Sequence, residues 1–133
     1  MSHEDYLRQS EEELNAADLL FNNGFYKEAV SRAYYSMFHA AQALLFIRDV
    51  YPKSHKGVIH KFGEEFVKTG LLERKMGQML SQAESMRMKA DYDVVIVIKK
   101  EECEDTIKKG KLFLSKVKEV ISELNLQRPK NKG

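Results

Sequence analysis

The fold of this chain is decided by residues 29–41, Ala29-Val30-Ser31-Arg32-Ala33-Tyr34-Tyr35-Ser36-Met37-Phe38-His39-Ala40-Ala41. The apolar residues of this stretch recur at three- and four-residue intervals, which is typical of a helix, and they cover more than one stripe of it. We therefore expect a helix at about residues 25–48 in the centre of a bundle. Polar side chains inside such a helix are costly unless they are paired, so Arg32, Tyr35 and His39 need partners.

Helical spacing continues through the rest of the chain. Gly24 is expected to end a first helix in the left-handed conformation, and Ser54 is expected to cap the third. The second and fourth helices are expected to be central. The fold class predicted is all-α, an up-and-down bundle of about five helices over residues 1–126, followed by a basic disordered tail at 127–133. The helices besides 25–48 are expected at about residues 4–22, 55–68, 72–92 and 101–124.

The run Val94-Val95-Ile96-Val97-Ile98 is the one ambiguous segment. Its β-branched residues are typical of a buried strand, but the chain offers no second strand of like quality to pair with it. A lone strand cannot satisfy its backbone hydrogen bonds. We expect an extended connector packed on the bundle, with some helix as the alternative.

Composition indicates a small globular domain without a membrane segment. The chain has 133 residues, of which 32% are charged and 43% apolar, and no apolar run approaches the roughly 18 residues that span a bilayer. The first residues are acidic, unlike a signal peptide, so we expect a cytoplasmic protein. The single cysteine, Cys103, cannot form an internal disulfide, and its acidic neighbours should discourage the thiolate. No metal site or cofactor is expected, because His55 and His60 are five residues apart and no glycine-rich phosphate loop is present.

Charge is distributed unevenly along the chain. Residues 1–28 carry two basic and seven acidic side chains, whereas residues 99–133 carry ten basic and six acidic ones. Opposite charges at the two ends could align the first and last helices antiparallel. They could also steer an RNA or an acidic partner toward the basic end.

Four segments of the chain stand out, in this order: Gly24-Phe25-Tyr26, residues 29–41, Ser54-His55-Lys56-Gly57-Val58 and Arg87-x-x-Ala90-Asp91-Tyr92. Together they resemble the HEPN-domain family, in its branch of small stand-alone proteins. The likeness covers about residues 5–125 and implies a helical bundle that commonly forms homodimers. It also implies a gene often placed beside a minimal nucleotidyltransferase in a toxin-antitoxin pair, and many members are metal-independent ribonucleases.

The ribonuclease members that this chain resembles use an arginine followed, after four to six residues, by a histidine at a dimer cleft. Histidine takes and gives a proton near neutral pH, and arginine holds the phosphate. Here Tyr92 stands five residues after Arg87. Only about one tyrosine in a thousand is ionised at pH 7, so Tyr92 is a poor base, and Asp91 is too weakly basic unless burial raises its pKa.

A second arginine and histidine, Arg32 and His39, fit the same spacing on the central helix. Residues 32, 35, 39 and 42 share one face of that helix. If this face opposes the fourth helix, it forms one cluster with Asp91 and Arg87, either a buried structural network or an active site. We further regard Arg32, Tyr35 and His55 as candidate contacts for a nucleotide or phosphate.

The resemblance also raises transfer of AMP to a tyrosine by the partner enzyme. In toxin members the acceptor lies two residues beyond the motif histidine, where this chain has Val94. Tyr92 is the nearest substitute acceptor. An acceptor needs an exposed hydroxyl, which a tyrosine that closes a buried motif would not offer.

Three functions remain open from the sequence. The favoured one is a dimeric, non-catalytic HEPN module that binds a minimal nucleotidyltransferase partner or a nucleotide. The others are a ribonuclease toxin that uses Arg87 with His39 or Tyr92, and a plain helical scaffold. The homodimer is expected because the second helix carries more apolar surface than one small bundle usually hides.

Overall fold

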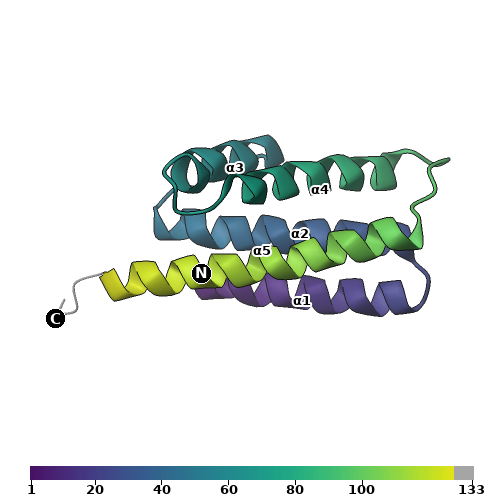
Figure 1. The fold of residues 1–133 in the computed structure, drawn as a ribbon, viewed down its shortest axis with the longest axis horizontal. Helices are drawn as coiled ribbons and strands as arrows, with labels where there is room; N and C mark the ends of the chain where they lie inside the picture. Colours follow the sequence, from purple (N-terminus) through teal and green to yellow (C-terminus); the bar gives the residue numbers. More distant parts are fainter. Residues whose placement is uncertain (128–133) are drawn as a thin grey trace.

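The protein folds as a bundle of α-helices, described by a computed structural model for residues 1–127 (Figure 1). No strand occurs among these residues, which confirms the all-α class. Of the tail predicted at 127–133, only Gln127 lies within the described residues, as the last residue of a helix. The elements are α1 (His3–Asn22), α2 (Tyr26–Ile47), α3 (His55–Phe62), the π-helical turn η1 (Gly63–Val67), α4 (Arg74–Tyr92) and α5 (Lys100–Gln127).

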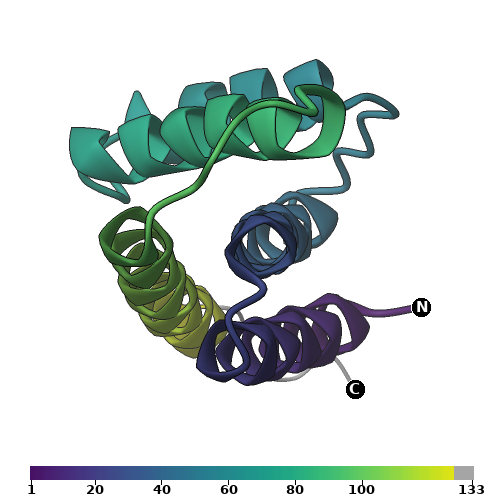
Figure 2. The ribbon, with the colours of Figure 1, turned by 90° about the vertical axis from the view of Figure 1, so that its right-hand side faces the viewer.

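The central helix is α2, as residues 29–41 predicted. It contacts every other α-helix, with α1 and α5 on one side and α3 and α4 on the other (Figure 2). Its apolar residues form the middle of a core to which α3, η1 and α5 contribute three fully buried aromatic rings, those of Phe62, Phe66 and Phe113. Burial of this apolar surface is the main force that holds the helices together.

The expectation that α4 is also central was wrong. This helix covers α2 from one side only and buries a single stripe, which ends with a charged residue: Met76, Met79, Leu80, Ala83 and Arg87. Met88 on another face of α4 is half exposed. Its methionines therefore fill one side of the core, and the helix belongs to the outer layer.

The apolar side chains of α2 are covered by the chain's own helices. Residues of α2 from Ala29 to Leu45 are buried on every side except a stripe that contains Arg32, Tyr35 and His39. The surplus apolar surface from which we expected a homodimer is therefore absent from α2. Large exposed apolar residues cluster instead after the end of α4.

Two of the predicted helix ends are confirmed. Ser54 Oγ accepts a hydrogen bond from the backbone N–H of Gly57 at 2.9 Å, so Ser54 is the N-cap of α3. Gly24 has φ +82°, the left-handed conformation that ends α1. The predicted helix at 55–68 is α3 continued by η1, in which the N–H of Lys68 donates to the carbonyl of Gly63, five residues back, at 2.8 Å.

The connector between α4 and α5 is extended only in part. Asp93 has an extended backbone, residues 94–95 form a turn, and residues 96–99 adopt no regular secondary structure. Ile98 is buried and Ile96 is partly buried, but Val94, Val95 and Val97 point away from the bundle and are 91%, 81% and 80% exposed. The expected packing on the bundle therefore holds for two of the five residues, and from Val95 to Ile98 exposed and covered side chains alternate as they do along a strand.

No helix in the described part of the chain combines the length and the apolar character needed to cross a membrane.

Candidate functional site

Arg87 lies in the last part of α4 with only 6% of its surface exposed. Its Nε and Nη2 donate to Oε1 of Glu84, one turn earlier, at 3.2 and 2.6 Å. Its Nη1 donates to Oδ2 of Asp91, one turn later, at 3.3 Å. Residues three and four apart share a helix face, so α4 itself supplies both carboxylates.

The Arg87 guanidinium also lies over two rings of α2. Its central carbon is 5.2 Å from the ring centre of Tyr34 and 5.7 Å from that of Tyr35. Burial by itself lowers the pKa of Arg87, but the hydrogen bonds with Glu84 and Asp91 outweigh burial and raise the pKa above its usual value. Arg87 is thus a permanent cation held by two carboxylates and two aromatic faces.

Asp91 and Tyr34 extend this network toward both ends of α2. Ser31 Oγ donates to Oδ1 of Asp91 at 2.6 Å. The Tyr34 hydroxyl shares a hydrogen bond of 2.7 Å with Nδ1 of His55, the first residue of α3. Burial, followed by the nearby charge of Glu84, raises the pKa of Tyr34, which therefore stays neutral.

His55 is held on two sides at the start of α3. Besides its bond to Tyr34, its ring stacks on that of Phe38 with centroids 4.5 Å apart. Ser54 fixes the first turn of α3 and so sets the position of this ring. His55 therefore joins α3 to α2, and its Nδ1 atom is occupied by the hydrogen bond with Tyr34.

A second polar cluster surrounds Glu13 of α1, which is buried. One oxygen accepts a hydrogen bond from Nη1 of Arg32 at 3.0 Å, and the other lies 3.8 Å from Nε2 of His39 and accepts from Gln9 at 3.3 Å. His39 Nδ1 shares a hydrogen bond of 2.9 Å with Gln42. Arg32 and His39 therefore pair with α1 and not with α4.

The single cluster expected from the sequence is therefore divided into two. Arg87 and Asp91 belong to the α4 network, and Arg32 and His39 belong to the Glu13 cluster. Tyr35 lies between them, with its ring centre 6.3 Å from that of His39. The division arises because α1 and α4 lie on opposite sides of α2 (Figure 2).

Tyr92 does not close a buried motif, contrary to our expectation. It is the last residue of α4 and is 74% exposed. Its hydroxyl makes no hydrogen bond with another described residue, whereas Arg87 is only 6% exposed. The side chain of Tyr92 is therefore accessible, whereas the guanidinium of Arg87 is enclosed.

Sequence reasoning missed Glu13 and Glu84, the two carboxylates that organise the clusters. Glu13 lies on the buried stripe of α1 with Ser10, Leu14 and Ala17, so its helical spacing was a usable signal. Glu84 precedes Arg87 by three residues, the distance of an intrahelical ion pair. Within residues 1–127 every buried side-chain nitrogen or oxygen atom has a hydrogen-bond partner.

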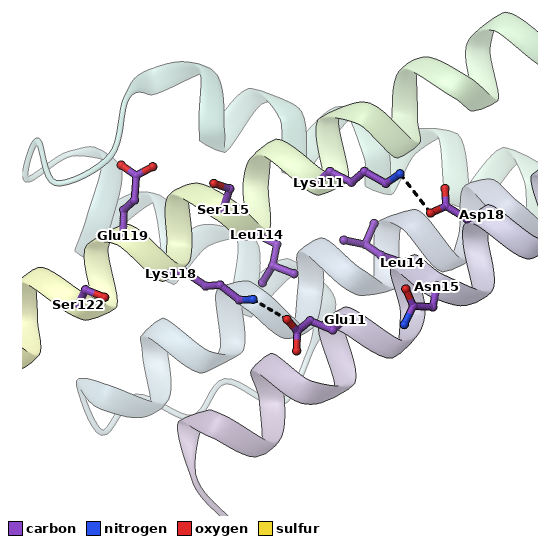
Figure 3. A pocket seen from close by; sticks show the side chains of 10 residues that line it. All are labelled: Glu11, Leu14, Asn15, Asp18, Lys111, Leu114, Ser115, Lys118, Glu119 and Ser122. Carbon is purple, nitrogen blue, oxygen red and sulfur yellow. Dashed lines mark hydrogen bonds and ion pairs between the residues drawn. The ribbon is translucent and has the colours of Figure 1, made fainter.

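A groove of about 820 Å³ runs between α1 and α5, away from both clusters (Figure 3). It is bridged by ion pairs of Lys111 with Asp18, at 3.1 Å, and of Lys118 with Glu11. Both pairs have the same register between two antiparallel helices. The opposite charges at the two ends of the chain therefore align the first and last helices antiparallel, one of the two effects that we expected from the charge distribution. None of the predicted site residues lines the groove.

Cys103 is buried in the small core cluster near the start of α5. Burial raises the pKa of its thiol to about 11. The cause is desolvation rather than the acidic neighbours that the sequence indicated. In the described residues no group of three or more histidine, cysteine, aspartate or glutamate side chains is arranged to hold a metal ion.

Comparison with known proteins agrees with this fold. The family model of the HEPN domain matches residues 3–120. The proteins named Putative toxin MJ0142 and Putative toxin MJ0605, both of Methanocaldococcus jannaschii, are 41% and 40% identical to this chain. The matches cover 96% and 86% of this chain and 87% and 85% of those proteins. A UPF0332 protein of Thermotoga maritima is 32% identical over 91% of this chain and 92% of its own length. The chain belongs to the HEPN-domain family.

Proposed function

We propose that this HEPN-domain protein acts by binding and not by catalysis, as a homodimer whose partner is a minimal nucleotidyltransferase. The observation that carries the proposal is the state of Arg87. Three of its N–H groups are bound to Glu84 and Asp91, and its guanidinium is covered by two tyrosine rings.

A catalytic arginine has to hold a phosphate group of RNA in the transition state. To do so, Arg87 would have to exchange its carboxylate partners for phosphate. Glu84 would then be left buried as a charge without a partner. The exchange is costly because a buried charge without a partner is strongly destabilising. Tyr92, which stands where the motif histidine of the ribonuclease members would align, is exposed and makes no hydrogen bond with Arg87.

The candidate nucleotide contacts are already engaged by the protein. Arg32 is paired with Glu13, and His55 is bound to Tyr34 and stacked on Phe38. A nucleotide at this stripe of α2 would have to compete with Glu13 for Arg32. Nucleotide or RNA binding here therefore remains a weaker part of the proposal than protein binding.

A second candidate is a metal-independent ribonuclease toxin built on the Glu13 cluster. It is favoured by the toxin names of two relatives and by the placement of Arg32 and His39 on one carboxylate. In that case His39 would act as the acid and base and Arg32 would bind the phosphate. Glu13 would orient both side chains.

Cleavage of a labelled RNA pool in EDTA distinguishes the two candidates. We expect no cleavage by the purified protein in excess over RNA. If cleavage occurs and is lost in His39→Ala and Arg32→Ala but kept in His60→Ala, the toxin candidate replaces the proposal. His60 is the matched control because it is an exposed histidine on α3, paired only with Glu64 at 3.2 Å.

The binding proposal has its own test. A tagged copy is co-expressed with the product of a neighbouring gene that carries the Gly-Ser and paired-aspartate signature of a nucleotidyltransferase. We expect the two proteins to co-purify in a fixed ratio. If no such neighbour exists, or if it fails to bind, the plain helical scaffold becomes the better description.

A further inference from the structure

We infer that the connector at residues 93–99 forms an antiparallel β-ribbon with the same segment of a second copy of the chain, an assignment that rests on the proposed homodimer. Figure 2 looks onto this end of the bundle and shows the connector crossing in front of the helices. Val94, Val95 and Val97 are almost fully exposed there, beside the exposed Tyr92. Exposed apolar residues gathered at one place mark an interaction surface.

The backbone of the connector is free to pair. The N–H groups of Val94, Val97 and Ile98 make no hydrogen bond with another described residue, and neither do the carbonyl groups of residues 94–98. Exposed and covered side chains alternate from Val95 to Ile98, as they do along a strand, and β-branched residues favour the extended conformation. A free extended backbone is a template for strand addition by another chain.

The turn at residues 94–95 is the part that pairing would change. It is held by the N–H of Val95 on the Asp93 carboxylate, at 3.1 Å, and by the N–H of Ile96 on the Asp93 carbonyl, at 3.3 Å. The first bond lies within the normal range, and the second is longer than that range. A ribbon replaces them with bonds between strands, so opening the turn costs little.

The charges at the two ends of the connector specify the second copy as the occupant. If two connectors pair antiparallel with Ile96 opposite itself, Asp93 of each copy faces Lys99 of the other, and Val95 faces Val97. Opposite charges and β-branched pairs directly across a ribbon stabilise it, whereas like charges destabilise it. The segment is therefore complementary to itself in this register.

A charge-swap experiment tests the register. Asp93→Lys places like charges opposite each other in a homodimer, and Lys99→Asp does the same, so each variant should dimerise about tenfold more weakly than the parent. An equimolar mixture of the two should form a heterodimer, because both cross-strand pairs are then attractive. The double variant Asp93→Lys/Lys99→Asp should recover the homodimer. Sedimentation velocity and native mass spectrometry measure each population.

A matched pair of variants tests the apolar contact. Val97→Asp should abolish the dimer, whereas Leu19→Asp, at a residue of α1 that is 65% exposed, should leave it intact. Circular dichroism should show both variants folded, because both positions are on the surface.

The outcomes separate this inference from the proposed function. If the parent dimerises and every connector variant dimerises equally well, the dimer uses another surface and the ribbon is refuted. If the parent is a monomer at its highest soluble concentration, the ribbon and the proposed homodimer fail together.

Discussion

Replacement of Arg87 by alanine should destabilise the protein strongly, because the guanidinium is the centre of the α4 network. The side chains of Arg87 and Glu84 are 7% and 15% exposed, so the variant leaves Glu84 as a nearly buried, unpaired charge. Breaking a buried pair typically costs about 3–5 kcal/mol. The side chain of Asp91 is 32% exposed and remains solvated, so we expect a cost at the lower end of this range.

The expected loss in the free energy of unfolding is therefore about 3 kcal/mol. The entropy of unfolding is about 2.1 cal/mol/K per residue, or about 0.28 kcal/mol/K for 133 residues, so Tm should fall by about 10 °C. Arg87→Lys keeps the charge but loses the planar fork, and about half of the stability loss should remain.

Urea unfolding followed by far-UV circular dichroism at pH 7 measures these losses. Arg74→Ala is the matched control, because Arg74 is an exposed arginine at the start of α4, and its loss should stay within about 0.5 kcal/mol. A double variant, Arg87→Met with Glu84→Gln, should recover part of the stability, since both buried charges are then gone. If Arg87→Ala is no less stable than Arg74→Ala, the network does not support the fold and our interpretation of Arg87 is refuted.

Three further predictions test the fold at separate places. Ser54→Ala should lower the free energy of unfolding by about 1 kcal/mol, and Ser54→Asp should not, because only alanine removes the cap of α3; thermal melts compare the two. Cys103 should react with iodoacetamide at pH 8 about a hundredfold more slowly in the folded protein than in urea, since a pKa of about 11 leaves about one thiol in a thousand ionised; equal rates would contradict its burial. Gly110→Leu should destabilise by about 1–3 kcal/mol, because even a Cβ there would lie 3.1 Å from Leu14 Cδ2. At Gly63 an added Cβ would meet nothing within 4 Å, so Gly63→Ala should be neutral or stabilising; thermal melts compare it with Gly110→Leu.

The helices and their ends could be predicted because their causes are local. Helical spacing identifies apolar stripes, and residues such as Gly24 and Ser54 end or begin a helix through their own backbone and side-chain chemistry. The central place of α2 followed from the number of its apolar faces. The same reasoning failed for α4 because its buried residues form a single stripe, and only the structure shows that its other faces, with Met88, have no cover.

For the polar clusters, the sequence could predict which residues need partners but not which residues pair with each other. The sequence indicates that Arg32, His39, Arg87 and Asp91 need partners, and all four have them. It does not fix how α1 and α4 are rotated about α2, and this rotation decides that His39 meets Glu13 instead of Asp91. The exposure of Val94, Val95 and Val97 was missed for a similar reason, since the β-branched run identifies a strand-like segment without showing which side is covered.

The most direct test of our account is the NMR signal of the Arg87 Nε–H group, assigned by its loss in Arg87→Lys. We predict slow exchange of this proton with water and an unchanged chemical shift when an RNA oligonucleotide is added, because Nε–H is bound to Glu84 inside the protein. Rapid exchange in the free protein, or a shift that saturates with added RNA, would show that Arg87 is available to phosphate. That result would contradict a structural role for Arg87 and return it to the list of catalytic candidates.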